Sequence, residues 1–228
     1  MHDLEALRSL APAQRERLDR YAALLLERNA SFNLTGARDL GAVSAHIADA
    51  LTIAPFIAGG PLIDIGSGGG MPAIPLGIAC DVSITLVEST LKKARFLEEA
   101  LQELKLSGEV VAQRAEVAAH DACYRERYIA ATARAVGKLT TVLELTLPFL
   151  DVGGRAVLQR GALTEGERKE AALTARALGG AVVGEERMTP ARWVVLVEKR
   201  DRTPQAFPRR TGVPARRPLT ARDVSGAA

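Results

Sequence analysis

A glycine-rich segment that follows a short apolar run is the part of the sequence best suited to chemistry. The run at residues 62–65 contains one acid, Asp64, and leads into four glycines between positions 66 and 70, after which Pro72 opens an apolar, helix-like stretch. Glycine has no Cβ, so such a loop can turn sharply and let its backbone approach a bound molecule closely. A strand, a glycine loop and a helix in this order predict a cradle for a nucleotide-like ligand, and an ordinary glycine turn is the alternative.

The positions of the glycines argue against a dinucleotide as that ligand. Dinucleotide-binding folds use the spacing G-x-G-x-x-G, in which the third glycine lets the helix pack closely on the strand. Gly66 and Gly68 fit that spacing, but Met71 stands where the third glycine belongs. The segment from Asp64 to Ser67, with the glycines that follow, is instead similar to the first motif of the S-adenosylmethionine (SAM) methyltransferases. In those enzymes the loop contacts a methionine moiety and a ribose and binds no phosphate.

A carboxylate stands at the distance where a β-α-β unit places a ribose ligand. Glu88 ends the apolar run that begins at residue 82, and it lies 22 positions after Gly66. We expect its oxygens to accept hydrogen bonds from ribose hydroxyls. Ser89 and Thr90 then lead into a helical pattern, so the alternative role of Glu88 is a favourable charge at a helix N-terminus. The two roles are compatible.

Composition limits the class of protein. At 228 residues, with 47% hydrophobic and 25% charged residues, the chain supports one sizeable α/β domain plus an appendage. It contains no apolar run long enough to span a membrane, and its N-terminus has no apolar signal region, which points to the cytoplasm. Cys80 and Cys123 form no disulfide framework and have no metal-ligand spacing, so we expect no metal.

Strand-like and helical patterns alternate along most of the chain. Strand-like runs occur at residues 62–66, 82–88, 109–113, 129–133, 155–159, 181–185 and 193–199, and helical patterns separate most of them, notably at residues 91–106, 139–149 and 164–178. This alternation predicts an α/β fold with a parallel sheet. Residues 186–192 are too few for a helical crossover, so the last two strands should be antiparallel. The expected fold is a seven-stranded, Rossmann-like sheet with one antiparallel strand near the C-terminus, as in SAM methyltransferases.

The two ends of the chain differ from this core. The first 57 residues are helical by period, with one amphipathic helix marked by Leu18, Tyr21, Leu24, Leu25 and Arg28 and a second at residues 42–57. We therefore expect a helical extension (1–57) packed on the core, a catalytic domain (58–200) and a C-terminal segment (201–228).

The C-terminal segment is basic and rich in proline. Residues 199–222 carry eight basic side chains against one acid, interleaved with four prolines. Such a segment should form no regular helix and should be an extended strap or a mobile tail. Its arginines could grip RNA phosphates without reading the sequence, or the segment could be a solvated, partly disordered terminus.

Eight short segments together resemble one family, the bacterial 16S ribosomal RNA guanine-N7 methyltransferases (RsmG, also called GidB). The resemblance covers roughly residues 29–219. The Thr-x-Arg-Ala-Val run at residues 132–136 and the Pro-Arg-Arg-x-Gly-x-Pro run at residues 208–214 are its most specific parts. The segments are residues 33–35, 46–51, 66–75, 91–97, 114–116, 132–136, 153–154 and 207–214.

This resemblance implies that SAM is the cofactor and S-adenosylhomocysteine the product. The glycine loop should line the methionine end, the acid after the second strand should hold the ribose, and Ala115 and Glu116 should bracket the adenine unless they merely begin a helix. Arg134 should lie near the SAM carboxylate or the incoming base, or else pair with Asp64 or Glu88. The residues expected at the cofactor are Asp64, Gly66, Ser67, Gly68, Met71, Glu88, Ser89, Thr90, Ala115, Glu116 and Arg134.

The acceptor implied by the resemblance is a guanine in the decoding-region loop of 16S rRNA in the small ribosomal subunit. Guanine N7 carries a lone pair and no proton, so it can attack the methyl group directly without a general base. The candidates for seating the guanine are Asn33, His46, Asp49 and Arg134, although His46 could be an ordinary half-buried histidine. RNA should contact the N-terminal helices and the basic residues Lys92, Arg160, Arg209, Arg210, Arg216 and Arg217.

Two other functions share parts of this sequence. A SAM-dependent methyltransferase of a small molecule, a protein or another RNA would keep the core, but one acting on a non-RNA acceptor would not need the arginine-rich tail. A non-catalytic RNA-binding assembly factor would keep the tail and tolerate damage to the cradle, whereas Gly66, Gly68, Glu88 and Arg134 are all intact. We expect a monomer that binds neither a membrane nor a metal.

Overall fold

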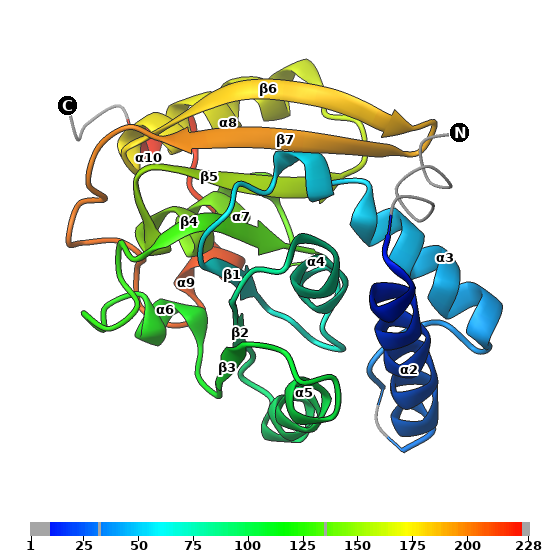
Figure 1. The fold of residues 1–228 in the computed structure, drawn as a ribbon. Helices are drawn as coiled ribbons and strands as arrows, with labels where there is room; N and C mark the ends of the chain where they lie inside the picture. The colour runs from blue at the N-terminus through cyan, green and yellow to red at the C-terminus, as the bar shows by residue number, and fades with distance from the viewer. Residues whose placement is uncertain (1–9, 32, 135, 225–228) are drawn as a thin grey trace. The chain divides into compact units, whose positions relative to one another are not determined.

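The computed structural model describes residues 10–31, 33–134 and 136–224, whose strands form a seven-stranded mixed sheet (Figure 1). The strand order is β3-β2-β1-β4-β5-β7-β6. The chain divides into two compact units, residues 1–113 and 114–228. The segment boundaries expected from the sequence, after residues 57 and 200, fall inside these units.

The first unit contains three parallel strands with helices between them. β1 pairs with β2 and β2 with β3, so that Leu62 lies opposite Ile84 and Ile84 opposite Gly108. All four residues of β1 and of β2 are buried, as expected of parallel strands covered on both faces. The elements are α2 (Pro12–Asn29), α3 (Leu40–Leu51), the 3-10 turn η1 (Ala54–Phe56), β1 (Leu62–Ile65), α4 (Ala73–Cys80), β2 (Ile84–Val87), α5 (Leu91–Glu103) and β3 (Gly108–Val111).

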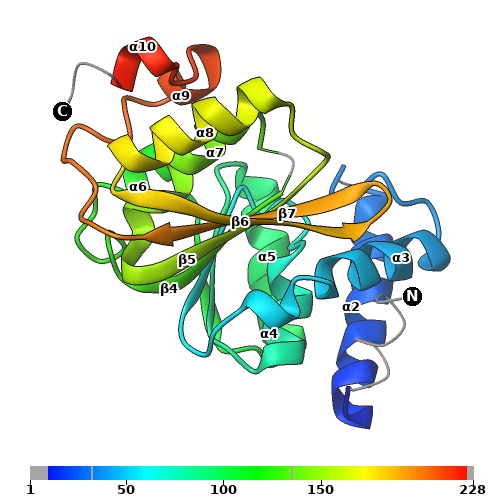
Figure 2. The same ribbon diagram turned by 90° about the horizontal axis from the view of Figure 1, so that it is seen from above.

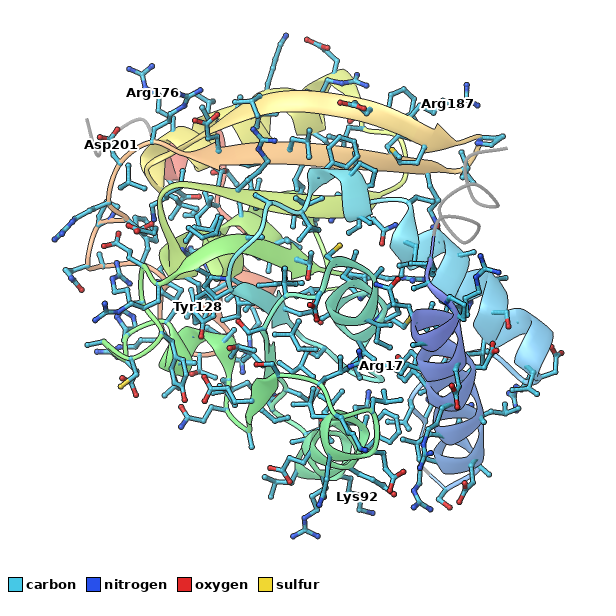
Figure 3. All side chains as sticks on the ribbon, viewed as in Figure 1. Arg17, Lys92, Tyr128, Arg176, Arg187 and Asp201 are labelled. Atoms are coloured by element: carbon cyan, nitrogen blue, oxygen red, sulfur yellow. The ribbon has the colours of Figure 1, made fainter. Side chains whose placement is uncertain are left out.

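Helix α2 is fastened to the ends of two neighbouring helices (Figure 1). The Gln14 side-chain amide donates to the carbonyls of Ile78 and Ala79, at 2.9 and 3.1 Å, where α4 ends. Arg17 donates to the carbonyls of Leu104 and Lys105, just past α5, and Figure 3 shows its side chain on the face of α2 that meets these helices. The last carbonyls of a helix have no partner within it, so α2 supplies the donors that they lack.

The second unit contains the remaining four strands. β4 pairs in parallel with β5, and β7 runs antiparallel to both β5 and β6. Helices α7 and α8 lie side by side over one face of these strands, and α10 contacts α8 (Figure 2). The elements are α6 (Ala115–Ala118), β4 (Tyr128–Ala133), α7 (Leu139–Thr146), η2 (Leu147–Phe149), β5 (Leu150–Arg160), α8 (Glu165–Ala177), β6 (Gly180–Thr189), β7 (Arg192–Lys199), α9 (Val213–Arg216) and α10 (Ala221–Val224).

The fold class predicted from the sequence is confirmed, including all seven strands and the antiparallel final pair. Three helix ends were predicted too late in the chain: the helix expected to reach residue 106 ends at Glu103, and the other two lie just before prolines. The helix expected to reach residue 57 ends at Leu51, and the one expected to reach residue 149 ends at Thr146. Each is followed by a 3-10 turn that contains a proline, Pro55 or Pro148, because proline lacks the N–H that would continue an α-helix.

The C-terminal segment also differs from expectation. It was predicted to form no helix, but it contains the short helices α9 and α10. Pro214 lies in the first turn of α9, where its missing N–H has no helical partner to lose.

Within the described residues, no helix is both long enough and apolar enough to cross a membrane.

Candidate functional site

The glycine loop is tied to the carboxyl ends of β1 and β2 by backbone hydrogen bonds. The N–H groups of Gly66 and Ser67 both donate to the carbonyl of Val87, at 2.9 and 3.1 Å. The Ser67 hydroxyl donates to the carbonyl of Asp64 at 3.0 Å, and the Gly70 N–H closes the turn onto Ser67 at 2.6 Å. These hydrogen bonds give the loop a defined shape.

Three of the glycines hold backbone conformations that other residues rarely adopt. The φ angles of Gly66, Gly68 and Gly70 are 72°, 56° and 90°. A Cβ on Gly70 would also lie 2.4 Å from Ile74 Cδ1 of α4, so the Ile74 side chain would have to move to admit it. A Cβ on Gly68 would meet only the Gly66 carbonyl oxygen, at 3.8 Å, so the space beside Gly68 is open. This is the shape of a cradle that a bound molecule can approach closely.

Glu88 closes the cradle from the end of β2. The residue is 7% exposed, and its carboxylate accepts hydrogen bonds from the backbone N–H of Gly68 at 3.0 Å and of Thr90 at 2.7 Å. The two bonds go to different oxygens, and each carboxylate oxygen can accept twice, so each keeps one acceptor position. Two adjacent acceptors suit the two neighbouring hydroxyls of a ribose. The role of Glu88 toward a ribose stays a prediction.

The alternative role of Glu88 is present in the same geometry. Thr90 is the N-cap of α5, and its N–H is one of the donors that Glu88 satisfies. A carboxylate at this position is also favoured by the helix dipole. Ser89 is half-buried, Thr90 is exposed and Met71 is half-buried at the other end of the loop. Their contacts with a cofactor stay predictions.

The candidate guanine-binding residues of the first unit lie on and before α3. Asn33 is exposed, while His46 and Asp49 are half-buried on the helix. The Asn29 side chain orders the segment before α3, because its oxygen accepts from the N–H groups of Leu34 and Thr35, both at 2.9 Å. The Thr35 hydroxyl in turn lies 3.4 Å from His46 Nδ1. His46 thus has a structural contact, and its role toward guanine stays a prediction.

The predicted adenine residues belong to the second unit. Ala115 and Glu116 are buried and begin α6, as the alternative interpretation had it. The Glu116 carboxylate accepts from the backbone N–H of Gly212 at 2.8 Å. Arg134 follows β4 and is half-buried. The roles of Ala115, Glu116 and Arg134 at the cofactor stay predictions.

Residues 203–219, the C-terminal strap, are fixed to the second unit at many points. The Arg125 guanidinium donates to the carbonyls of Thr203 and Phe207, at 2.7 and 2.9 Å, and the Thr141 hydroxyl donates to the carbonyl of Pro214 at 2.9 Å. Lys199 is fully buried and donates to Thr203 Oγ1 at 2.5 Å, and burial lowers the pKa of Lys199 to about 8. These contacts hold residues 203–214 against other parts of the same unit.

The arginines of the strap divide into two kinds. Arg209 makes a two-pronged ion pair with Glu144, whose side chain is fully buried, with N–O distances of 2.9 and 2.6 Å. Arg210, Arg216 and Arg217 are exposed. Arg209 therefore has a structural task that the sequence did not reveal, and the three exposed guanidinium groups are the ones open to solvent for phosphates.

The two remaining predicted RNA contacts differ in exposure. Lys92 is exposed on α5, and Figure 3 shows its side chain pointing outward from the helix. Arg160 is half-buried and donates to the carbonyl of Gly137 at 3.0 Å, and burial lowers the pKa of its guanidinium. Contact of either residue with RNA stays a prediction.

One residue at the glycine loop was missed as a functional residue by the sequence analysis. Tyr21, expected only to mark a helix face, donates from its hydroxyl to the carbonyl of Gly69 at 2.6 Å. The residues lie 48 positions apart, and no local pattern predicts that they meet.

Among the described residues, no group of three or more His, Cys, Asp or Glu side chains could hold a metal ion.

Comparison with known sequences identifies close relatives. Residues 14–184 match the family model GidB, described as rRNA small subunit methyltransferase G. A ribosomal RNA small subunit methyltransferase G from Rubrobacter xylanophilus is 43% identical over 220 residues, covering 89% of this chain and 82% of that protein. The protein of the same name from Dehalococcoides mccartyi is 38% identical over 221 residues, covering 92% and 94%.

A solved structure shares the fold at lower identity. The 1,6-didemethyltoxoflavin-N1-methyltransferase of Burkholderia thailandensis, crystallised with 1,6-didemethyltoxoflavin and S-adenosylhomocysteine, aligns over 80% of this chain and 90% of its own. The TM-score is 0.52 at 19% identity, a level at which the likeness concerns the fold alone.

Gly70→Ala should damage the cradle, because alanine is strained at a φ of 90° and its Cβ would collide with Ile74. We expect a loss of stability of at least ~1–3 kcal/mol in urea unfolding, with weaker S-adenosylhomocysteine binding. Gly36→Ala is the matched control, since nothing lies within 4 Å of its Cβ position. Equal behaviour of the two variants would show that the loop adapts easily to a side chain at position 70.

Arg209→Ala should destabilise the second unit, because it leaves the buried Glu144 carboxylate without its ion-pair partner. Breaking a buried pair in this way costs about 3–5 kcal/mol. Arg210→Ala removes the same charge from an exposed neighbour and should change the unfolding free energy by no more than ~0.5 kcal/mol. If chemical denaturation gave equal stabilities for the two variants, Arg209 would not anchor the strap.

Proposed function

Because the chain belongs to the rRNA small subunit methyltransferase G family, we propose that it transfers a methyl group from SAM to N7 of a guanine in 16S rRNA. The chain is an enzyme, and methyl transfer to small-subunit rRNA follows from the family. The N7 position, the decoding-region loop as target and the residue roles below are the proposed parts.

Residues of the first unit would hold the methionine end and the ribose of SAM. Gly66, Gly68 and Met71 would line its methionine end, and the two remaining acceptor positions of Glu88 would take the ribose hydroxyls. The adenine would lie against Ala115 and Glu116. The observation that carries this assignment is the buried Glu88 carboxylate fixed to the glycine loop. When bound, SAM supplies a methyl group made electrophilic by its positive sulfur.

The residues of the chain have little proton chemistry to perform in this reaction. Guanine N7 has an in-plane lone pair and carries no proton, so its direct attack on the methyl group requires no general base. The task of the protein is to hold the base and the cofactor in line, which can contribute about 7–11 kcal/mol to lowering the barrier. Asn33, His46, Asp49 and Arg134 are the proposed contacts with the guanine.

The RNA would be held mainly by exposed cations. Lys92 on α5 and Arg210, Arg216 and Arg217 on the strap are all exposed. Contacts of such side chains with phosphates position RNA without reading its sequence. The target should be an accessible, unpaired guanine, because the deep groove of A-form RNA hides N7 from side chains. A monomeric enzyme that acts in the cytoplasm without a metal remains part of the proposal.

The direct test is methyl transfer to small ribosomal subunits from cells that lack the modification, with labelled SAM and mapping of the product. We expect one N7-methylguanosine in the decoding-region loop. Glu88→Gln should lower activity at limiting SAM roughly 10- to 100-fold. Glutamine has only one acceptor oxygen, so its N–H₂ group would face one of the two backbone N–H donors and that hydrogen bond would be lost. Glu98→Gln, at an exposed position on α5, is the control.

Other outcomes of that assay would redirect the assignment. Methylation of another atom of guanine would contradict the N7 proposal and leave the cofactor site standing. Methylation of a different RNA or of a small molecule would contradict the proposed acceptor. SAM binding with no transfer to subunits, precursor particles or free rRNA would favour a non-catalytic RNA-binding factor. Full activity of Glu88→Gln would contradict the ribose role of Glu88.

A further inference from the structure

A buried hydroxyl of the N-terminal helix α2 donates a hydrogen bond to the glycine loop. Tyr21 is fully buried, and its Oη donates to the Gly69 carbonyl at 2.6 Å. Gly69 directly follows Gly68, whose N–H donates to Glu88. The two bonds thus hold adjacent residues of the loop, one to α2 and the other to the acid after β2.

The loop also rests against the extension through close packing. A Cβ on Gly69 would lie 3.0 Å from Leu25 Cδ1 of α2 and 3.1 Å from the Leu34 carbonyl oxygen. Leu25 is fully buried and Leu34 nearly so. These residues leave no room for a side chain at position 69, so the loop packs directly against α2 and the segment before α3.

The same segment leads to the candidate guanine-binding residues. Asn29, at the end of α2, fixes the backbone of Leu34 and Thr35, and the Thr35 hydroxyl contacts His46 on α3. A connected set of contacts therefore runs from the cofactor loop through residues 33–35 to the helix expected to face RNA. Every member of this set belongs to the first unit.

Helix α2 can act as a firm support because its charged and polar side chains bond to α4 and α5. Besides Gln14 and Arg17, Arg28 forms an ion pair with Glu99 of α5, and the hydrogen bonds between these two side chains raise the pKa of Arg28 and lower that of Glu99. Arg20 pairs with Glu103 one turn further along α5. These contacts hold Tyr21 in place over the loop.

We propose that Tyr21 is a positioning residue that couples RNA binding at the N-terminal extension to cofactor binding at the glycine loop. Its hydroxyl holds the Gly69 carbonyl so that the Gly68 N–H meets Glu88. RNA that steadies α2 and residues 33–35 would then steady the loop, and a bound cofactor would favour the RNA-binding form of the extension by the same factor. The inference rests on the proposed function, since it needs both a cofactor at the loop and RNA at the extension.

The test begins with binding of S-adenosylhomocysteine to the purified full-length protein by calorimetry. Tyr21→Phe keeps the ring and removes the hydroxyl, and it should weaken binding roughly 3- to 10-fold, the range for loss of one hydrogen bond. Thr146→Val is the control, because it removes a buried hydroxyl that donates to the Val142 carbonyl at 2.8 Å in the second unit. Wild-type affinity of Tyr21→Phe would overturn the positioning role, whatever its stability.

Coupling is measured by repeating the titrations with saturating unmodified small subunits. We expect the subunits to tighten S-adenosylhomocysteine binding to the wild type at least about threefold, and to tighten it clearly less for Tyr21→Phe. A tightening that is absent in the wild type, or equal in both proteins, would overturn the coupling. A role of Tyr21 in stability alone would lower the unfolding midpoint and leave this ratio unchanged.

Glu88→Gln separates failure of this inference from failure of the proposed function. If Glu88→Gln binds S-adenosylhomocysteine as tightly as the wild type, the proposed cofactor site is wrong. If Glu88→Gln binds weakly while Tyr21→Phe binds normally, the cofactor site stands and only the role of Tyr21 is overturned.

Discussion

The carboxylate of Glu88 accepts hydrogen bonds from the backbone N–H groups of Gly68 and Thr90, and the candidate site depends on this interaction. One bond fixes the glycine loop after β1, and the other satisfies the start of α5. A single buried acid thus joins the two strand ends of the cradle and still offers two acceptor positions. Burial makes the arrangement demanding, because a carboxylate removed from water must find hydrogen-bond donors.

Polar and charged side chains stabilise different parts of the two units. In the first, polar and charged side chains of α2 meet the ends of α4 and the side of α5, and so hold Tyr21 over the loop. In the second, buried Lys199 holds the start of the strap at Thr203, and buried Glu144 holds Arg209 within the strap. The strap is therefore part of the folded unit, and its exposed arginines stand on a fixed support. A basic segment that is already folded could bind phosphates without the loss of conformational entropy that ordering a flexible tail would cost.

The sequence predicted those parts of the molecule that depend on local chemistry. The strands followed from apolar runs, and the cradle followed from glycines beside an acid, because backbone freedom and burial are properties of neighbouring residues. The helix ends at Leu51 and Thr146 were missed, although Pro55 and Pro148 carried the signal. The contacts Tyr21–Gly69 and Arg209–Glu144 join residues 48 and 65 positions apart, so only the folded chain reveals them.

The central claim is that Glu88 recognises a ribose, and one measurement addresses it directly. The affinities of S-adenosylhomocysteine and its 2′-deoxyribose analogue are compared on the wild type and on Glu88→Gln. The account predicts that the wild type binds the natural ligand at least about tenfold more tightly than the analogue, and that most of this preference disappears in Glu88→Gln. An equal preference in both proteins would mean that Glu88 does not contact the sugar.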